Sequence, residues 1–126
     1  MTWDELAIDL LKAAKAMLRT HPRSSASRAY YAAHIALAKV LEAGGFVPAS
    51  GYSTQHHTRQ SKLIGQYLQR LGARGVRNMK QVFSRLYARR VDSDYVRRVT
   101  IDSNIAMESV RDASAVFAVL GVQEVA

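Results

Sequence analysis

Ser27-Arg28-Ala29-Tyr30-Tyr31-Ala32-Ala33-His34, residues 27–34, is the stretch that decides the fold, because it sets large and charged groups among small ones. Alanine favours helix, and small side chains let a neighbouring helix approach closely. A guanidinium stays protonated in a protein, so near a core it needs a partner or a wet cleft. Adjacent tyrosines combine apolar bodies with polar tips. The stretch therefore predicts a packed helix that borders a polar groove.

The rest of the chain predicts an all-α fold, a compact bundle of about five helices in one domain spanning residues 1–126. The chain has 48% hydrophobic residues, which is enough for a core, and only two prolines. Apolar residues recur at helical spacing in five segments. The predicted helices cover residues 2–19, 24–42, 55–71, 79–87 and 102–120, with a loop at 46–56, a turn at 72–77 and a loop at 92–94.

Charge is distributed unevenly along the chain. The net charge is +8, made up of +2 over residues 1–50, +9 over residues 51–100 and −3 over residues 101–126. A concentrated basic segment attracts polyanions, of which nucleic acid is the commonest. The alternative is a solvated basic surface that only keeps the protein soluble.

Composition also bears on location and on metal binding. The absence of cysteine excludes disulfides and thiolate metal sites. The first residues are acidic instead of basic and apolar, unlike a signal peptide, and no apolar run reaches membrane-spanning length. We expect a cytoplasmic protein that has no membrane partner, no metal and no cofactor.

Three motifs occur in order along the chain. Ser-Arg-Ala-Tyr-Tyr-Ala-Ala covers residues 27–33, His57 lies at the start of the third predicted helix, and Leu-Tyr-x-x-Arg-x-x-x-Asp-Tyr covers residues 86–95. In order and spacing the chain resembles the HEPN superfamily, in particular the stand-alone branch with an Arg-Ala-Tyr-Tyr-Ala signature in its second helix. The resemblance covers nearly the whole chain.

The resemblance implies a helical bundle, frequently dimeric, that binds RNA or nucleotides. Many HEPN proteins are metal-independent ribonucleases, and many form toxin–antitoxin pairs with a small nucleotidyltransferase. The expected protein is thus the toxin-like half of such a pair and a homodimer. The alternatives are a non-enzymatic nucleotide-binding or adaptor subunit of a nucleotidyltransferase and, as a minor option, a DNA-binding regulator.

The candidate catalytic pair is Arg28 and His34. HEPN ribonucleases use an arginine followed after four to six residues by a histidine; the segment around Arg90 contains no histidine, whereas Arg28 and His34 have the spacing. An imidazole suits proton transfer and a guanidinium suits a phosphate. On a regular helix, however, the two side chains point about 120° apart and lie roughly 9 Å apart along the axis. The alternative is a packed histidine and a structural arginine.

The candidate RNA- or nucleotide-binding residues are Tyr31, His57, Arg90, Asp94 and Tyr95. Arg90 and Asp94 are four residues apart and pair if the segment is helical, with Tyr95 beside them. The functional interpretation is a polar cluster that lines a cleft and offers Arg90 to a phosphate. The alternative is a structural network that fixes the approach to the last helix.

Overall fold

The structure is a computed structural model, and it describes residues 1–123. Within that range the protein is an all-α bundle of five helices, as the sequence predicts. The helices are α1 (Trp3–Ala16), α2 (Pro22–Ala43), α3 (Gln60–Tyr67), α4 (Gly72–Tyr95) and α5 (Ser103–Leu120), with short 3₁₀ segments at His57–Arg59 and Gln69–Leu71. None of these helices is long and apolar enough to cross a membrane.

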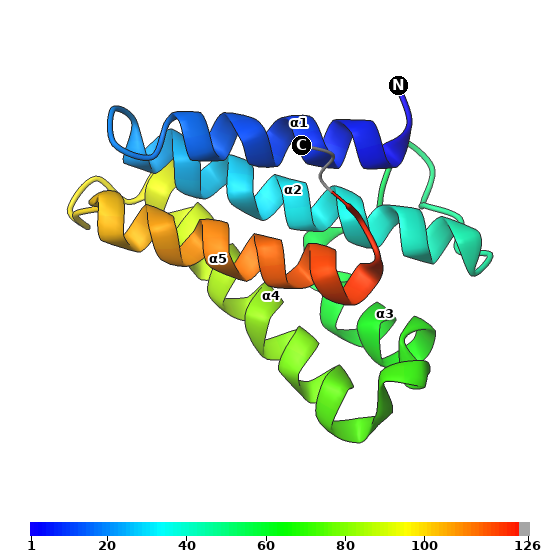
Figure 1. The fold of residues 1–126 in the computed structure, drawn as a ribbon. Helices are drawn as coiled ribbons and strands as arrows, with labels where there is room; N and C mark the ends of the chain where they lie inside the picture. Colours follow the sequence, from blue (N-terminus) through cyan, green and yellow to red (C-terminus); the bar gives the residue numbers. More distant parts are fainter. Residues whose placement is uncertain (124–126) are drawn as a thin grey trace.

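Helix α2 lies at the centre of the bundle. It packs against α1, α4 and α5, while α3 packs mainly on α4 (Figure 1). The N-terminal half of α4 diverges from the other long helices and carries α3 with it, whereas its C-terminal end returns to the start of α2 (Figure 1). The loop after α2 runs back beside the N-terminus of α1 (Figure 1).

The signature stretch forms the centre of the core. Ala29, Tyr30, Ala32 and Ala33 have no exposed surface, and they belong to one apolar cluster with residues of all five helices. Their small side chains allow the close packing of α2 that the sequence predicts. Tyr30 alone fills a large volume there, so its hydroxyl must find a partner inside the protein.

Several helix ends agree with the sequence. Thr2 and Glu5 form the predicted capping box of α1. The side chain of Asp102 accepts a hydrogen bond from the backbone N–H of Ile105 at the start of α5, and Gly121 ends α5 with a φ of 76°. A positive φ suits glycine because it has no Cβ.

Several predicted boundaries are wrong: the first helix ends at Ala16 and not at residue 19, and the third covers Gln60–Tyr67 and not 55–71. Helix α2 begins at Pro22, in its first turn, where proline's missing N–H costs nothing. The turn predicted at 72–77 and the loop predicted at 92–94 are both part of α4, which runs unbroken from Gly72 to Tyr95. Gly72, with a φ of 74°, makes the corner before α4, and the chain needs no further turn.

Arg23 holds the C-terminal end of α4. Its Nη1 donates to the carbonyl oxygens of Asp92 and Ser93, both at 3.0 Å, and of Val96 at 3.2 Å. Its Nη2 donates to the carbonyl of Val99. The last carbonyls of a helix lack partners within the helix, and a cation there also opposes the negative end of the helix dipole. This contact places the end of α4, with its polar residues, against α2.

Candidate functional site

Arg90, on α4, is held between two tyrosine rings. Its guanidinium carbon lies 5.2 Å from the ring centre of Tyr31 on α2 and 5.3 Å from that of Tyr95. Nη2 donates to the Tyr31 hydroxyl at 2.7 Å, and Nε lies 3.1 Å from a carboxylate oxygen of Asp94. Stacking of an arginine on aromatic rings leaves its edge for polar partners. The structure thus joins four of the five predicted binding residues.

The fifth predicted binding residue, His57, contacts the same group from the 3₁₀ segment before α3. Its ring centre lies 6.0 Å from that of Tyr31 and 5.7 Å from that of Tyr87. Tyr30, fully buried beneath it, places its hydroxyl 2.5 Å from His57 Nδ1 and receives a hydrogen bond of 2.7 Å from Gln60 Nε2. Burial raises the pKa of Tyr30, so the hydroxyl keeps its proton.

The direction of these hydrogen bonds defines the tautomer of His57. The amide of Gln60 donates to the Tyr30 hydroxyl, so the hydroxyl donates to Nδ1 of His57. Neutral imidazole then carries its proton on Nε2. Partial burial, and next the positive charge of Arg90, lower the pKa of His57, so the neutral form is favoured at pH 7. His57 therefore offers a hydrogen-bond donor at Nε2, not a basic nitrogen.

His34 lies in the core and has both ring nitrogens occupied. Nδ1 donates to Gln60 Oε1 at 2.8 Å, and the Thr54 hydroxyl donates to Nε2 at 3.0 Å. Gln55 Nε2 donates to the His34 backbone carbonyl at 2.9 Å. Only 4% of His34 is exposed, and burial lowers its pKa to about 4. It is a neutral structural group that links α2 to the segment before α3.

The structure does not assemble the predicted catalytic pair. Arg28 is half-buried and makes no hydrogen bond, ion pair or ring contact with any of residues 1–123. The nitrogens of His34 are committed to other partners. The physical reason is helix geometry, because side chains six residues apart point in different directions. From α2 it is Arg23 and Ser27 that reach the end of α4, and Ser27 donates to Asp94 at 3.1 Å.

A hollow of about 220 Å³ opens beside His57. His57, Ser61, Lys80, Ser84 and Tyr87 contribute to its lining. Lys80 makes no ion pair within residues 1–123. A free ammonium, two hydroxyls and an imidazole N–H are donors of the kind that hold a phosphate.

Most other cations of the basic segment are exposed and have no acidic partner among residues 1–123. Arg85 and Arg89 of α4 form ion pairs with Asp112 of α5 and so connect these two helices. The remaining arginines and lysines of the basic segment other than Lys80 and Arg90 are exposed and have no acidic partner in the described part of the chain: Arg59, Lys62, Arg70, Arg74, Arg77, Arg97 and Arg98. The excess charge of this segment is therefore mostly available to a ligand.

The sequence analysis missed Gln55, Gln60, Lys80, Tyr87 and Arg23. A signal existed for Gln60, which lies three residues after His57 on the face of α3 that also carries Leu63 and Ile64. A polar residue on such a face predicts a buried hydrogen bond. For the other residues the relevant partners are remote in the chain.

Among residues 1–123, no group of three or more histidine, aspartate or glutamate side chains is placed to hold a metal ion. Comparisons with protein-family models, with curated proteins and with solved structures found no match to the chain. Functional inference therefore depends on the geometry of the site.

Proposed function

We propose that this protein binds RNA, or a ribonucleotide, through the surface formed by Tyr31, His57, Tyr87, Arg90 and Tyr95, here called the tyrosine–arginine surface. The observation that carries the proposal is that partly exposed tyrosine rings lie against Arg90 and beside the hollow that Lys80 lines. Tyr95 is 70% exposed and Tyr87 is 37% exposed. Single-stranded nucleic acids bind where bases stack on aromatic side chains and cations follow the backbone.

The hollow beside His57 supports a phosphate contact on this surface. Lys80 supplies a charge, and His57 supplies an N–H that stays neutral and oriented by Tyr30. Arg90 is partly neutralised by Asp94, so its main contribution is a cationic ring stack and a fixed position for Tyr31 and Tyr95.

We further propose binding without cleavage as the activity of this surface. Metal-independent cleavage needs a group that takes the proton of the 2′-hydroxyl. His34 is buried with both nitrogens bonded, and His57 presents a protonated nitrogen. This favours the nucleotide-binding or adaptor function over the ribonuclease function. The association with a small nucleotidyltransferase as the toxin-like half of a pair, and the homodimer, rest on the HEPN resemblance.

Substitution of Lys80 tests the proposal. Lys80→Ala should weaken binding of a labelled single-stranded RNA several-fold, because one phosphate contact is lost. The slope of log affinity against log salt should also become shallower by about 0.7, the value for one contact with a single strand. Fluorescence anisotropy at several salt concentrations measures both quantities.

Lys12→Ala is the matched control, because Lys12 is an exposed lysine on α1 and the variant changes the net charge equally. It should leave the affinity within about twofold of wild type. Equal losses in the two variants would mean that only net charge matters, and this outcome would refute the tyrosine–arginine surface as the binding site.

A further inference from the structure

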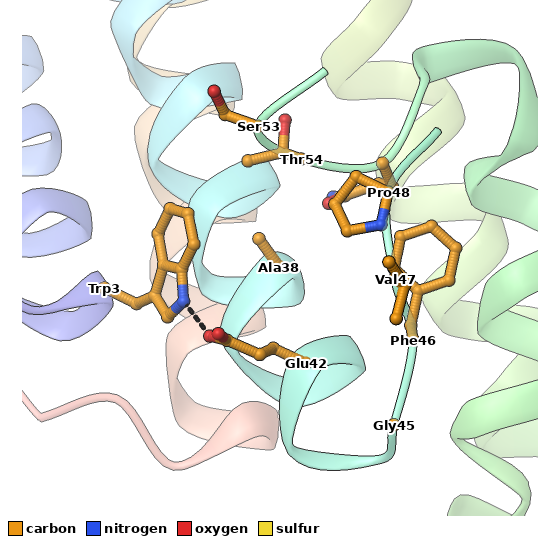
Figure 2. Close-up of a pocket in the computed structure, with 10 residues that line it drawn as sticks. Trp3, Ala38, Glu42, Gly45, Phe46, Val47, Pro48, Ser53 and Thr54 are labelled. Atoms are coloured by element: carbon orange, nitrogen blue, oxygen red, sulfur yellow. Dashed lines mark hydrogen bonds between the residues drawn. The ribbon is translucent and has the colours of Figure 1, made fainter. Parts of the chain in front are cut away.

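A second pocket, of about 340 Å³, lies where α1, α2 and the loop of residues 46–56 meet. Trp3 lines one side, Phe46, Val47 and Pro48 line the opposite side, and Ala38 of α2 lies between them (Figure 2). The walls are thus an indole, a phenyl ring and aliphatic groups. Such a slot suits a flat ring system.

The charged group of this pocket is an acceptor. The carboxylate of Glu42 accepts a hydrogen bond from the indole N–H of Trp3 (Figure 2) and has acceptor capacity left. Gln55 also lines the pocket and is only 3% exposed, yet its Oε1 has no hydrogen-bond partner among residues 1–123. That oxygen is itself closed to solvent, so the polar contact that the pocket offers to a ligand is the carboxylate of Glu42.

The pocket continues toward the tyrosine–arginine surface. Trp3, Ser53, Thr54 and Gln55 also line an adjoining hollow, together with Tyr31 and His57. Along α2, Glu42 and Tyr31 are eleven residues apart, which is about 16 Å. One trough therefore has a carboxylate acceptor at its first end and, at its second end, the Tyr31 ring that contacts Arg90.

We propose that the acceptor-lined pocket binds a guanine base, a proposal that rests on the proposed function. Guanine is flat, and its N1–H and exocyclic amino group are adjacent donors that match a carboxylate. The length of the trough exceeds one nucleotide, so guanosine monophosphate fills the pocket alone, while an RNA strand reaches the tyrosine–arginine surface as well.

The hydrogen-bonding pattern of the carboxylate also disfavours other bases. Uracil presents carbonyl oxygens on both sides of its single N–H, and these face the carboxylate unfavourably. Hypoxanthine, the base of inosine, lacks only the exocyclic amino group of guanine. A comparison of the two bases therefore measures what that donor contributes to binding. Loss of one hydrogen bond to a charged group costs about 1.5–3 kcal/mol, which is at least about tenfold in affinity.

Trp3 gives a direct readout because it is the only tryptophan of the chain. Titration with guanosine monophosphate should change Trp3 fluorescence, and inosine monophosphate should bind at least about tenfold more weakly.

Glu42→Gln should weaken the binding of guanosine monophosphate by a similar factor, because an amide places a donor against the base. Glu42 is exposed, and the glutamine still accepts from the indole, so the fold should persist. Asp9→Asn, an equal charge change on the exposed face of α1, should bind normally.

Two further comparisons distinguish failure of the guanine pocket from failure of the proposed function. Lys80→Ala should weaken RNA but not guanosine monophosphate, whereas Glu42→Gln should weaken both guanosine monophosphate and guanine-containing RNA. RNA binding that depends on Lys80 but not on Glu42, with equal affinities for the guanosine and inosine monophosphates, would refute the guanine pocket and leave the proposed function standing. Tighter binding of N-acetylarginine amide than of guanosine monophosphate would also refute it and indicate a cationic peptide instead.

Discussion

At the scale of single residues, neutrality is the decisive property of His34. Its imidazole is buried, bonded at both nitrogens and held uncharged by its surroundings. Protonation would force Nε2, which now accepts from Thr54, to become a donor facing a hydroxyl and would place a charge in the core. His34 therefore ties folding to pH.

We predict that the free energy of unfolding decreases as the pH falls from about 6.5 toward about 4. His34 has a folded-state pKa of about 4 and an ordinary value of 6.5, so within this window unfolding takes up a proton. Its contribution is fully present above pH 6.5 and is lost on acidification, with a limiting slope of about 1.4 kcal/mol per pH unit. Urea unfolding from pH 7.5 to 4.5, followed by circular dichroism, measures the slope.

His34→Gln supplies the comparison for this experiment. Glutamine keeps hydrogen-bonding capacity but does not titrate, so the variant should have a shallower pH dependence than wild type whatever its stability at pH 7.5. Parallel curves for the two proteins would show that His34 is not the titrating group.

At the scale of elements, the end of α4 depends on α2. Arg23 donates hydrogen bonds to four carbonyl oxygens, three of them from residues in or directly after the last turn of α4. Without it these carbonyls would need water, and the half-buried segment leading to α5 would lose its anchor.

Arg23→Ala should lower the free energy of unfolding by about 2 kcal/mol or more, because several carbonyls lose a charged donor. Hydrogen exchange should accelerate at the amides of residues 90–96 more than elsewhere. Arg28→Ala is the control from the same helix: Arg28 is half-buried and without polar partners among residues 1–123, so its loss should cost under about 0.5 kcal/mol. Comparable destabilisation by both variants would contradict the anchoring role of Arg23.

The contact between Arg23 and the end of α4 separates the parts of the fold that the sequence predicts from those that it does not. Local signals located α1, the body of α2 and α5, because caps and apolar periodicity depend on neighbours in the chain. The polar segment 92–94 resembles a loop locally, and its helical state is supported by Arg23 from α2 and by the Arg90–Asp94 pair. Arg90, Asp94 and Tyr95 were predicted together because they lie in one sequence motif, residues 86–95. Gln55 and Lys80 were not, because their roles depend on pockets formed by several segments.

At the scale of the whole molecule, the arginines and lysines of the basic segment form two groups. Some pair with acidic residues of α5, and most of the others have no acidic partner among residues 1–123. Acidic residues of α5, such as Asp112, neutralise Arg85 and Arg89, while the cations of α3, the N-terminal half of α4 and the segment after α4 stay unpaired among the described residues. The exposed cations therefore lie toward both ends of α4: on α3 and the N-terminal half of α4, and on the segment that follows α4.

We predict a steep salt dependence for RNA binding by the wild-type protein. If four to six of the exposed cations contact phosphates, the slope of log affinity against log salt should be about −3 to −4. A double variant, Arg74→Ala with Arg77→Ala, should make the slope shallower if the diverging half of α4 takes part. A slope near zero would exclude the basic segment as a contact surface.

The contact between Arg23 and the end of α4 also has a consequence for the order of events during synthesis. Arg23 precedes its acceptors by 69 to 76 residues, so it leaves the ribosome long before them. Until residues 92–99 emerge, the guanidinium of Arg23 lacks the carbonyl oxygens to which it donates in the folded protein. This contact between α2 and the end of α4 can therefore form only after residues 92–99 have been synthesised.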